Sequence, residues 1–144
     1  MTHPHHPSSI RALHRAALPA LLAGALALAG CAATTAEGEH DTALTLFEPA
    51  DQTLVRGTTN KLLVVVDRDN VPGDLEIEIH ALPHGVDVVE DDPRIAAGER
   101  SATVTLHTEA DADLTTGHPM RVEVESPDGL TVSEWIEVDV VARR

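Results

Sequence analysis

The sequence has no tyrosine and contains one phenylalanine, Phe47, one tryptophan, Trp135, and one cysteine, Cys31, among its 144 residues. A single cysteine excludes an intrachain disulfide, so the chain has to fold without one. Because aromatic residues are scarce, any core must be built from Val, Leu, Ile and Ala, which supply most of the 42% hydrophobic content.

Basic residues are scarce as well, with ten Lys and Arg against 24 Asp and Glu. Two of the basic residues, Arg11 and Arg15, precede Cys31, whereas every acidic residue follows it. The chain from Cys31 onward therefore has eight basic and 24 acidic residues, a formal charge of −16. Because a nucleic-acid-binding surface needs basic side chains to neutralise phosphates, we expect no nucleic acid partner.

Motifs for catalysis are also missing. No serine lies in a G-x-S-x-G sequence, and the chain has neither a phosphate-binding loop nor a dinucleotide-binding fingerprint. The histidines of the patterned region lack zinc-ligand spacing, and we interpret them as solvated surface residues: His80, His84, His107 and His118. The sequence thus predicts a protein without enzymatic activity and without a resident cofactor.

The first 30 residues combine a basic segment with an apolar one. Arg11 and Arg15 lie in the basic segment, which has no acidic residue, and residues 16–29 are Ala and Leu with one Gly and one Pro. The apolar segment is shorter than the roughly 20 residues of a membrane-spanning helix, which favours a cleaved leader. It leads into Leu28-Ala29-Gly30-Cys31.

The segment Leu28-Ala29-Gly30-Cys31 resembles the lipobox of bacterial lipoproteins. This resemblance implies that residues 1–30 are a signal peptide and that the Cys31 sulfur carries a diacylglyceryl group, with palmitate among its acyl chains. Two or three acyl chains anchor a protein stably, so the mature chain would stay at a membrane of the cell envelope. The absence of an acidic residue directly after Cys31 favours the outer membrane in a Gram-negative cell. An ordinary secretory leader, with Cys31 incidental, is the alternative.

Residues 31–41 are expected to form the lipidated cysteine and a flexible tether, because residues 32–41 show no hydrophobic periodicity. Ten flexible residues have a root-mean-square reach of roughly 18 Å. Any domain that follows the tether would therefore sit close to its membrane.

From Thr42 the pattern changes to alternating apolar and polar residues rich in β-branched side chains, which is typical of β-strands. We predict strands within residues 42–142 at 44–46, 62–66, 75–81, 86–88, 102–106, 120–124 and 132–140. Turns containing glycine or proline separate them. About seven strands in about 100 residues is the count of a single immunoglobulin-like (Ig-like) antiparallel β-sandwich.

Three turn sequences carry a second resemblance: Val55-Arg56-Gly57, Leu82-Pro83-His84-Gly85-Val86 and Ala97-Gly98. Together with the expected strands they resemble Ig-like and fibronectin-type domains of bacterial surface proteins, over most of residues 42–142. The resemblance implies a β-sandwich outside the cytoplasm and no particular activity. The chain departs from antibody domains, because it lacks their cysteine pair, the Trp of the third strand and the Tyr of the tyrosine corner.

Strand parity predicts an acidic outer face. If Val132, Ile136 and Val138 point inward, the residues between them point outward, and the third and sixth strands follow the same rule. In an Ig-like topology the third, sixth and seventh strands share one sheet. The candidate binding face consists of Trp135 with six acidic residues: Glu76, Glu78, Glu123, Glu125, Glu137 and Asp139. Adjacent like charges destabilise a sheet, so cations or a basic partner would neutralise them.

The position of Trp135 has two interpretations. Trp135 is exposed if the last strand alternates regularly from end to end. A β-bulge at Glu134, which interrupts the inward apolar series, would instead turn Trp135 into the core.

Acidic turns offer a second kind of site. Calcium takes six to eight oxygen ligands, and two acidic loops can supply them where they meet. The candidate residues are Asp67, Asp69, Asn70, Asp91 and Asp92, although none lies in an EF-hand sequence. Solvated turns without an ion are the alternative.

These observations predict a membrane-anchored envelope lipoprotein that serves as a non-catalytic binding or accessory module for an envelope protein. The alternative is a carbohydrate- or calcium-dependent adhesion module. Such a module would bind a glycan on the Trp135 face or calcium in the acidic turns.

Replacing Cys31 by Ser is expected to abolish incorporation of labelled palmitate, because the sulfur that would carry the lipid is removed. Metabolic labelling of the expressed full chain measures this, with the unaltered chain as control. Labelling that persists in the Cys31→Ser variant would contradict the lipoprotein interpretation.

Overall fold

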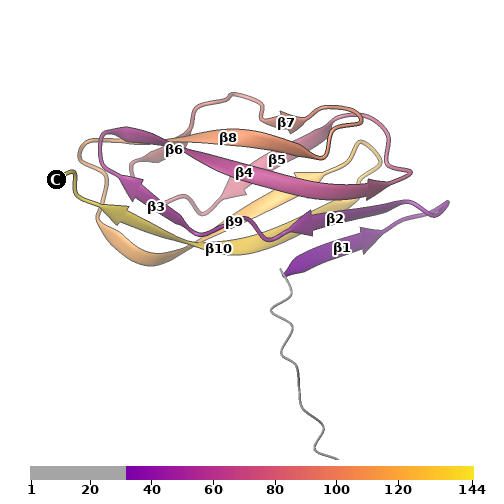
Figure 1. The fold of residues 1–144 in the computed structure, drawn as a ribbon, viewed down its shortest axis with the longest axis horizontal. Coiled ribbons are helices and arrows are strands. Elements are labelled where there is room, and N and C mark those ends of the chain that lie inside the picture. Colours follow the sequence, from indigo (N-terminus) through magenta and orange to yellow (C-terminus); the bar gives the residue numbers. More distant parts are fainter. Residues whose placement is uncertain (1–31) are drawn as a thin grey trace, which may run out of the picture.

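The computed structural model describes residues 32–144, which form two β-sheets packed face to face (Figure 1). The predicted signal peptide and Cys31 lie outside the described residues. Within residues 32–144 no helix is long and apolar enough to cross a membrane.

Each sheet contains five strands. The first sheet has the order β1 (Ala33–Glu37), β2 (Ala43–Phe47), β4 (Thr58–Asp69), β8 (Ser101–Thr108) and β6 (Val86–Val88). The second has the order β3 (Gln52–Val55), β10 (Thr131–Val141), β9 (Thr115–Glu125), β5 (Leu75–His80) and β7 (Arg94–Ile95).

The strand order is that of an Ig-like β-sandwich. β2, β4, β8 and β6 occupy the positions of the Ig strands A, B, E and D, and β5, β9 and β10 occupy those of C, F and G. β3 pairs with β10 in parallel, whereas the other pairings are antiparallel. The predicted fold is therefore confirmed. All seven predicted strands are present, and β1, β3 and β7 add to them.

The core between the sheets is aliphatic, as the composition predicts. Inward residues alternate with outward ones along each long strand: on β4 Leu62, Val64 and Val66 are buried, and on β9 Met120, Val122 and Val124 are buried. Phe47 and Trp135 are both exposed. Alternation thus buries the aliphatic side chains and leaves the charged residues of the same strands on the outer faces.

The interpretation of residues 31–41 as a tether is wrong for the segment Ala33–Glu37, which forms β1. The ladder between β1 and β2 runs from the pair Ala33–Phe47 to the pair Glu37–Ala43. Thr34 on β1 also donates a hydrogen bond of 2.6 Å from its hydroxyl to Glu134 Oε1 on β10, in the other sheet. Hydrophobic periodicity did not reveal β1, because Ala36 is the one β1 side chain that packs against the core. Backbone hydrogen bonds and the polar contact of Thr34 supply the rest of its stability.

The adjacent residues Leu62 and Leu63 provide a matched test of this packing. Leu62 is fully buried, whereas Leu63 is 56% exposed on the outer face of the same strand. Leu62→Ala is expected to lower the free energy of unfolding by about 2–5 kcal/mol, because it leaves a cavity in the core. Leu63→Ala is expected to change it by less than about 0.5 kcal/mol. Urea unfolding measures both values, and equal losses would contradict the assigned strand parity.

Candidate functional site

The structure assembles the predicted acidic residues on the outer face of β5, β9 and β10. Across β5 and β9, Glu76 is paired with Glu125 and Glu78 with Glu123. Glu137 is exposed on the outward side of β10. Like charges directly opposite each other repel, so this face would be stabilised by an added positive charge.

Trp135 lies on the same face and is 56% exposed. The β9–β10 ladder is continuous from the pair Thr131–Glu125 to the pair Val138–His118, and its register shift falls between Val138 and Val140. A bulge at Glu134 is therefore excluded. Glu134 instead keeps the inward phase and is half-buried, with Thr34 as its hydrogen-bond donor.

Arg121 of β9 is the basic residue opposite Trp135. Its guanidinium carbon lies 5.9 Å from the centre of the Trp135 ring, within the range of a cation–π contact. Arg121 Nη2 also lies 3.5 Å from Glu123 Oε2. One arginine thus connects the exposed ring to the acidic residues.

Asp139, the remaining predicted residue of the face, has a structural contact. The backbone N–H of Gly117 donates a hydrogen bond of 2.7 Å to Asp139 Oδ1, next to the register shift between β9 and β10. We conclude that Asp139 fixes the start of β9. Of the other acidic residues of the face, Glu78 and Glu123 have ion-pair contacts of their own.

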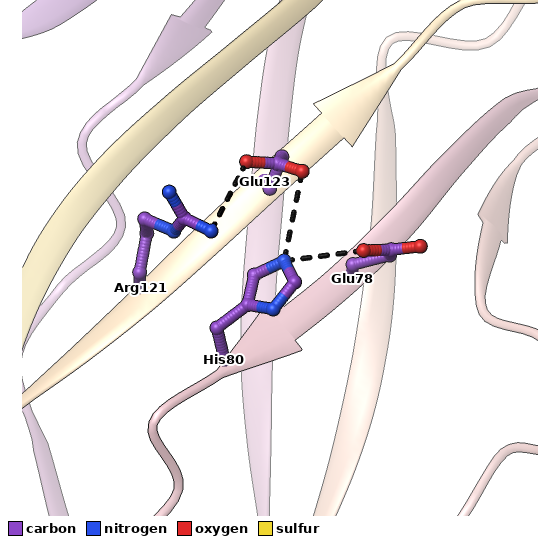
Figure 2. A network of polar contacts seen from close by, with 4 residues as sticks. All are labelled: Glu78, His80, Arg121 and Glu123. Atoms are coloured by element: carbon purple, nitrogen blue, oxygen red, sulfur yellow. Dashed lines mark ion pairs between the residues drawn. The ribbon is translucent and has the colours of Figure 1, made fainter.

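Glu78, His80 and Glu123 form a compact group at the centre of the face (Figure 2). His80 Nε2 lies 3.1 Å from Glu78 Oε2 and 3.6 Å from Glu123 Oε1. In Figure 2 the two carboxylates approach this one nitrogen, from β5 and from β9. Glu123 turns its second oxygen towards Arg121.

Strand parity predicts that His80 and Arg121 lie on this face, but the sequence did not single out either residue as a functional candidate. The interpretation of His80 as a solvated surface residue is wrong, since it is half-buried between two glutamates. Strand parity puts both residues on the outer face with Glu78 and Glu123. The cross-strand register shows that these four residues are neighbours, because it pairs His80 with Arg121 and Glu78 with Glu123.

The calcium candidates do not form a comparable group. Asp67 Oδ1 is 2.7 Å from Arg100 Nη1, and the Nδ2 of Asn70 donates a hydrogen bond to the carbonyl oxygen of Asp41. Asp92 is paired with Arg94.

The hydrogen bond to Asp92 and the attraction of its charge raise the pKa of the Arg94 guanidinium.

Among residues 32–144, the one group of three His or acidic side chains with metal-ligand spacing is Glu78, His80 and Glu123. The calcium site stays a prediction without support from these contacts, and Asp69 and Asp91 belong to no such group.

No family model and no curated protein matches the chain. Among solved structures, a chimeric titin Z1Z2 is 17% identical, with a TM-score of 0.41, over 69% of this chain and 95% of that one. A complex of titin M10 with an obscurin-like 1 Ig domain is 16% identical, with a TM-score of 0.42, over 72% and 98%. Murine CRIg is 14% identical, with a TM-score of 0.33, over 70% and 98%. The Ig-like assignment rests on strand order and pairing.

Trp135 is the only tryptophan, so its fluorescence reports on this face alone. We expect the red-shifted emission of a solvated indole, and stronger quenching by caesium ions than by iodide, because the surrounding carboxylates attract cations. The difference between the two quenchers should shrink at high ionic strength, where the charges are screened. Blue-shifted emission that neither ion quenches would contradict the exposed position.

Proposed function

We propose that this chain is a lipid-anchored protein of a bacterial cell envelope whose Ig-like domain binds a protein partner and has no catalytic role. The observation that carries the proposal is the exposed Trp135, in contact with Arg121 on a sheet face of paired glutamates. Tryptophan and arginine are enriched among the residues that contribute most to protein–protein binding.

The charge of the face favours a basic partner surface. Two Glu–Glu pairs stand opposite each other on β5 and β9, and Arg121 is the basic residue that contacts Glu123. A partner with exposed Lys or Arg would relieve the repulsion between these glutamates and would be steered to the face by the protein's negative charge.

The start of β1 supports a short connection to the membrane. β1 begins two residues after Cys31, and the carbonyl oxygen of Ala32 accepts a hydrogen bond of 2.9 Å from the backbone N–H of Glu48. If Cys31 carries the lipid, the folded domain lies directly against the membrane. The outer membrane is the proposed location if the cell is Gram-negative.

The outer face of the first sheet carries apolar side chains near this start. Ala33 is paired with Phe47, and Phe47 with Val65 on the next strand. Phe47 is 38% exposed, and Leu63 is more exposed still. These side chains suit contact with lipid, whereas the acidic face lies on the opposite sheet and is open to a partner from the envelope.

Photo-crosslinking tests the partner proposal. Ser133 lies on β10 opposite Glu123, beside Trp135. A benzoylphenylalanine at position 133, in the otherwise unaltered chain expressed in its own cell envelope, is expected to crosslink to one protein species. Adding Trp135→Ala should reduce the yield by more than about tenfold, in line with the cost of removing a central aromatic anchor.

Leu114→Ala is the matched control, because Leu114 is 55% exposed but lies between β8 and β9, outside the face. It should leave the crosslink unchanged. A crosslink that survives Trp135→Ala would contradict the assigned binding face. Crosslinking to a glycan alone would favour the adhesion alternative.

A further inference from the structure

The ring nitrogen Nε2 of His80 has no solvent access and no hydrogen-bond partner, although two carboxylates lie beside it. The separation of 3.1 Å from Glu78 Oε2 is short enough for an ion pair, but neither oxygen meets the geometry of a hydrogen bond to Nε2. Buried polar atoms without a protein partner are uncommon in folded proteins, and many of those that occur contact a bound ion or a water molecule.

The distances fit a metal ion between the three side chains. In a tetrahedral zinc site with bonds of about 2.0–2.1 Å, neighbouring ligand atoms lie about 3.3 Å apart. His80 Nε2 is 3.1 Å and 3.6 Å from the two carboxylate oxygens, and all three atoms lie within 4.8 Å of one another. The Glu78 side chain is 50% exposed, so small rotations of it could bring its carboxylate oxygen to the spacing of a tetrahedral site.

We propose that Glu78, His80 and Glu123 bind one Zn²⁺ ion on the outer face of β5 and β9. His80 would bind through Nε2 and the two glutamates through one oxygen each. A site with three protein ligands leaves the fourth position to a water molecule or to a side chain of a partner. Metal binding at this site goes beyond the proposed partner binding and does not require it.

The ligand set favours zinc over calcium. Imidazole nitrogen and carboxylate oxygen suit Zn²⁺, whereas Ca²⁺ takes six to eight oxygen ligands. The ion would also remove the repulsion between Glu78 and Glu123, which are directly opposite in the ladder.

The positive charge of Arg121 would weaken the binding of a Zn²⁺ ion at this site. Arg121 contacts Glu123 Oε2 rather than Oε1, the oxygen that faces His80. The oxygen proposed to bind the ion therefore stays free of the guanidinium.

Isothermal titration with zinc chloride tests the site. The chain from residue 31 onward retains the whole core, which lies between Leu44 and Val140, and Cys31→Ser removes the one thiol that could bind zinc. We expect one Zn²⁺ per chain, no displacement by calcium in the same concentration range, and a shift of the His80 ring signals in NMR spectra.

His80→Ala and Glu123→Gln should each weaken zinc binding by at least about tenfold, the loss seen even for groups that only support a metal ligand. Arg121→Gln should strengthen binding, because it removes a positive charge beside the ion. His107→Ala is the matched control, since His107 is exposed on the outer face of the other sheet and should not affect binding.

Circular dichroism of each variant separates a lost ligand from a lost fold. If the chain from residue 31 onward, with Cys31→Ser as its one substitution, binds no zinc at millimolar concentration, the proposal is overturned. Binding that is unchanged in both His80→Ala and Glu123→Gln would overturn it as well, because it would place the ion elsewhere.

Discussion

Burial of aliphatic side chains between the two sheets is the constraint on which the rest of the structure depends. The chain has no disulfide, and neither Phe47 nor Trp135 is buried, so the alternating Val, Leu and Ile residues supply the apolar area that stabilises the fold. Once these residues point inward, the face on which each side chain lies is fixed, because a slip of one residue would expose the apolar residues. Glu78 and Glu123 are thereby placed on the outer face, where the observed register sets them opposite each other. The acidic face is thus a direct consequence of the way the core packs.

Much of the fold could be predicted because the signal is periodic. The seven strands with apolar alternation were predicted from the sequence, and the sheet shared by β5, β9 and β10 follows from Ig-like topology. β1 was missed because the segment Ala-Thr-Thr-Ala-Glu has no apolar alternation and depends on pairing with β2. The candidate site could be predicted only in outline. Parity gives the face of His80, but its position between Glu78 and Glu123 depends on cross-strand register, which no local pattern encodes.

The two outer faces differ in chemistry. The face of β5, β9 and β10 combines carboxylates, an imidazole, a guanidinium and an exposed indole, whereas the other sheet exposes Phe47 and Leu63 next to the start of β1. A sandwich whose core is only two residue layers thick can separate such surfaces over a short distance. The proposed anchor and the proposed binding face therefore need not compete for the same surface.

The pairing of β1 also determines how an anchored chain would respond to force. A load applied between the membrane and a bound partner enters the domain at β1, which hydrogen-bonds in the ladder to β2 alone and contacts β10 through Thr34. We expect an edge strand of this kind to detach before the core strands, because the fully buried residues begin at Leu44 and Ala36 is the one β1 side chain that packs against them. Detachment would release residues 32–41, and these ten residues can extend to at most roughly 33–36 Å under load. The segment would be a paired β-strand without load and an unpaired, extended chain under load.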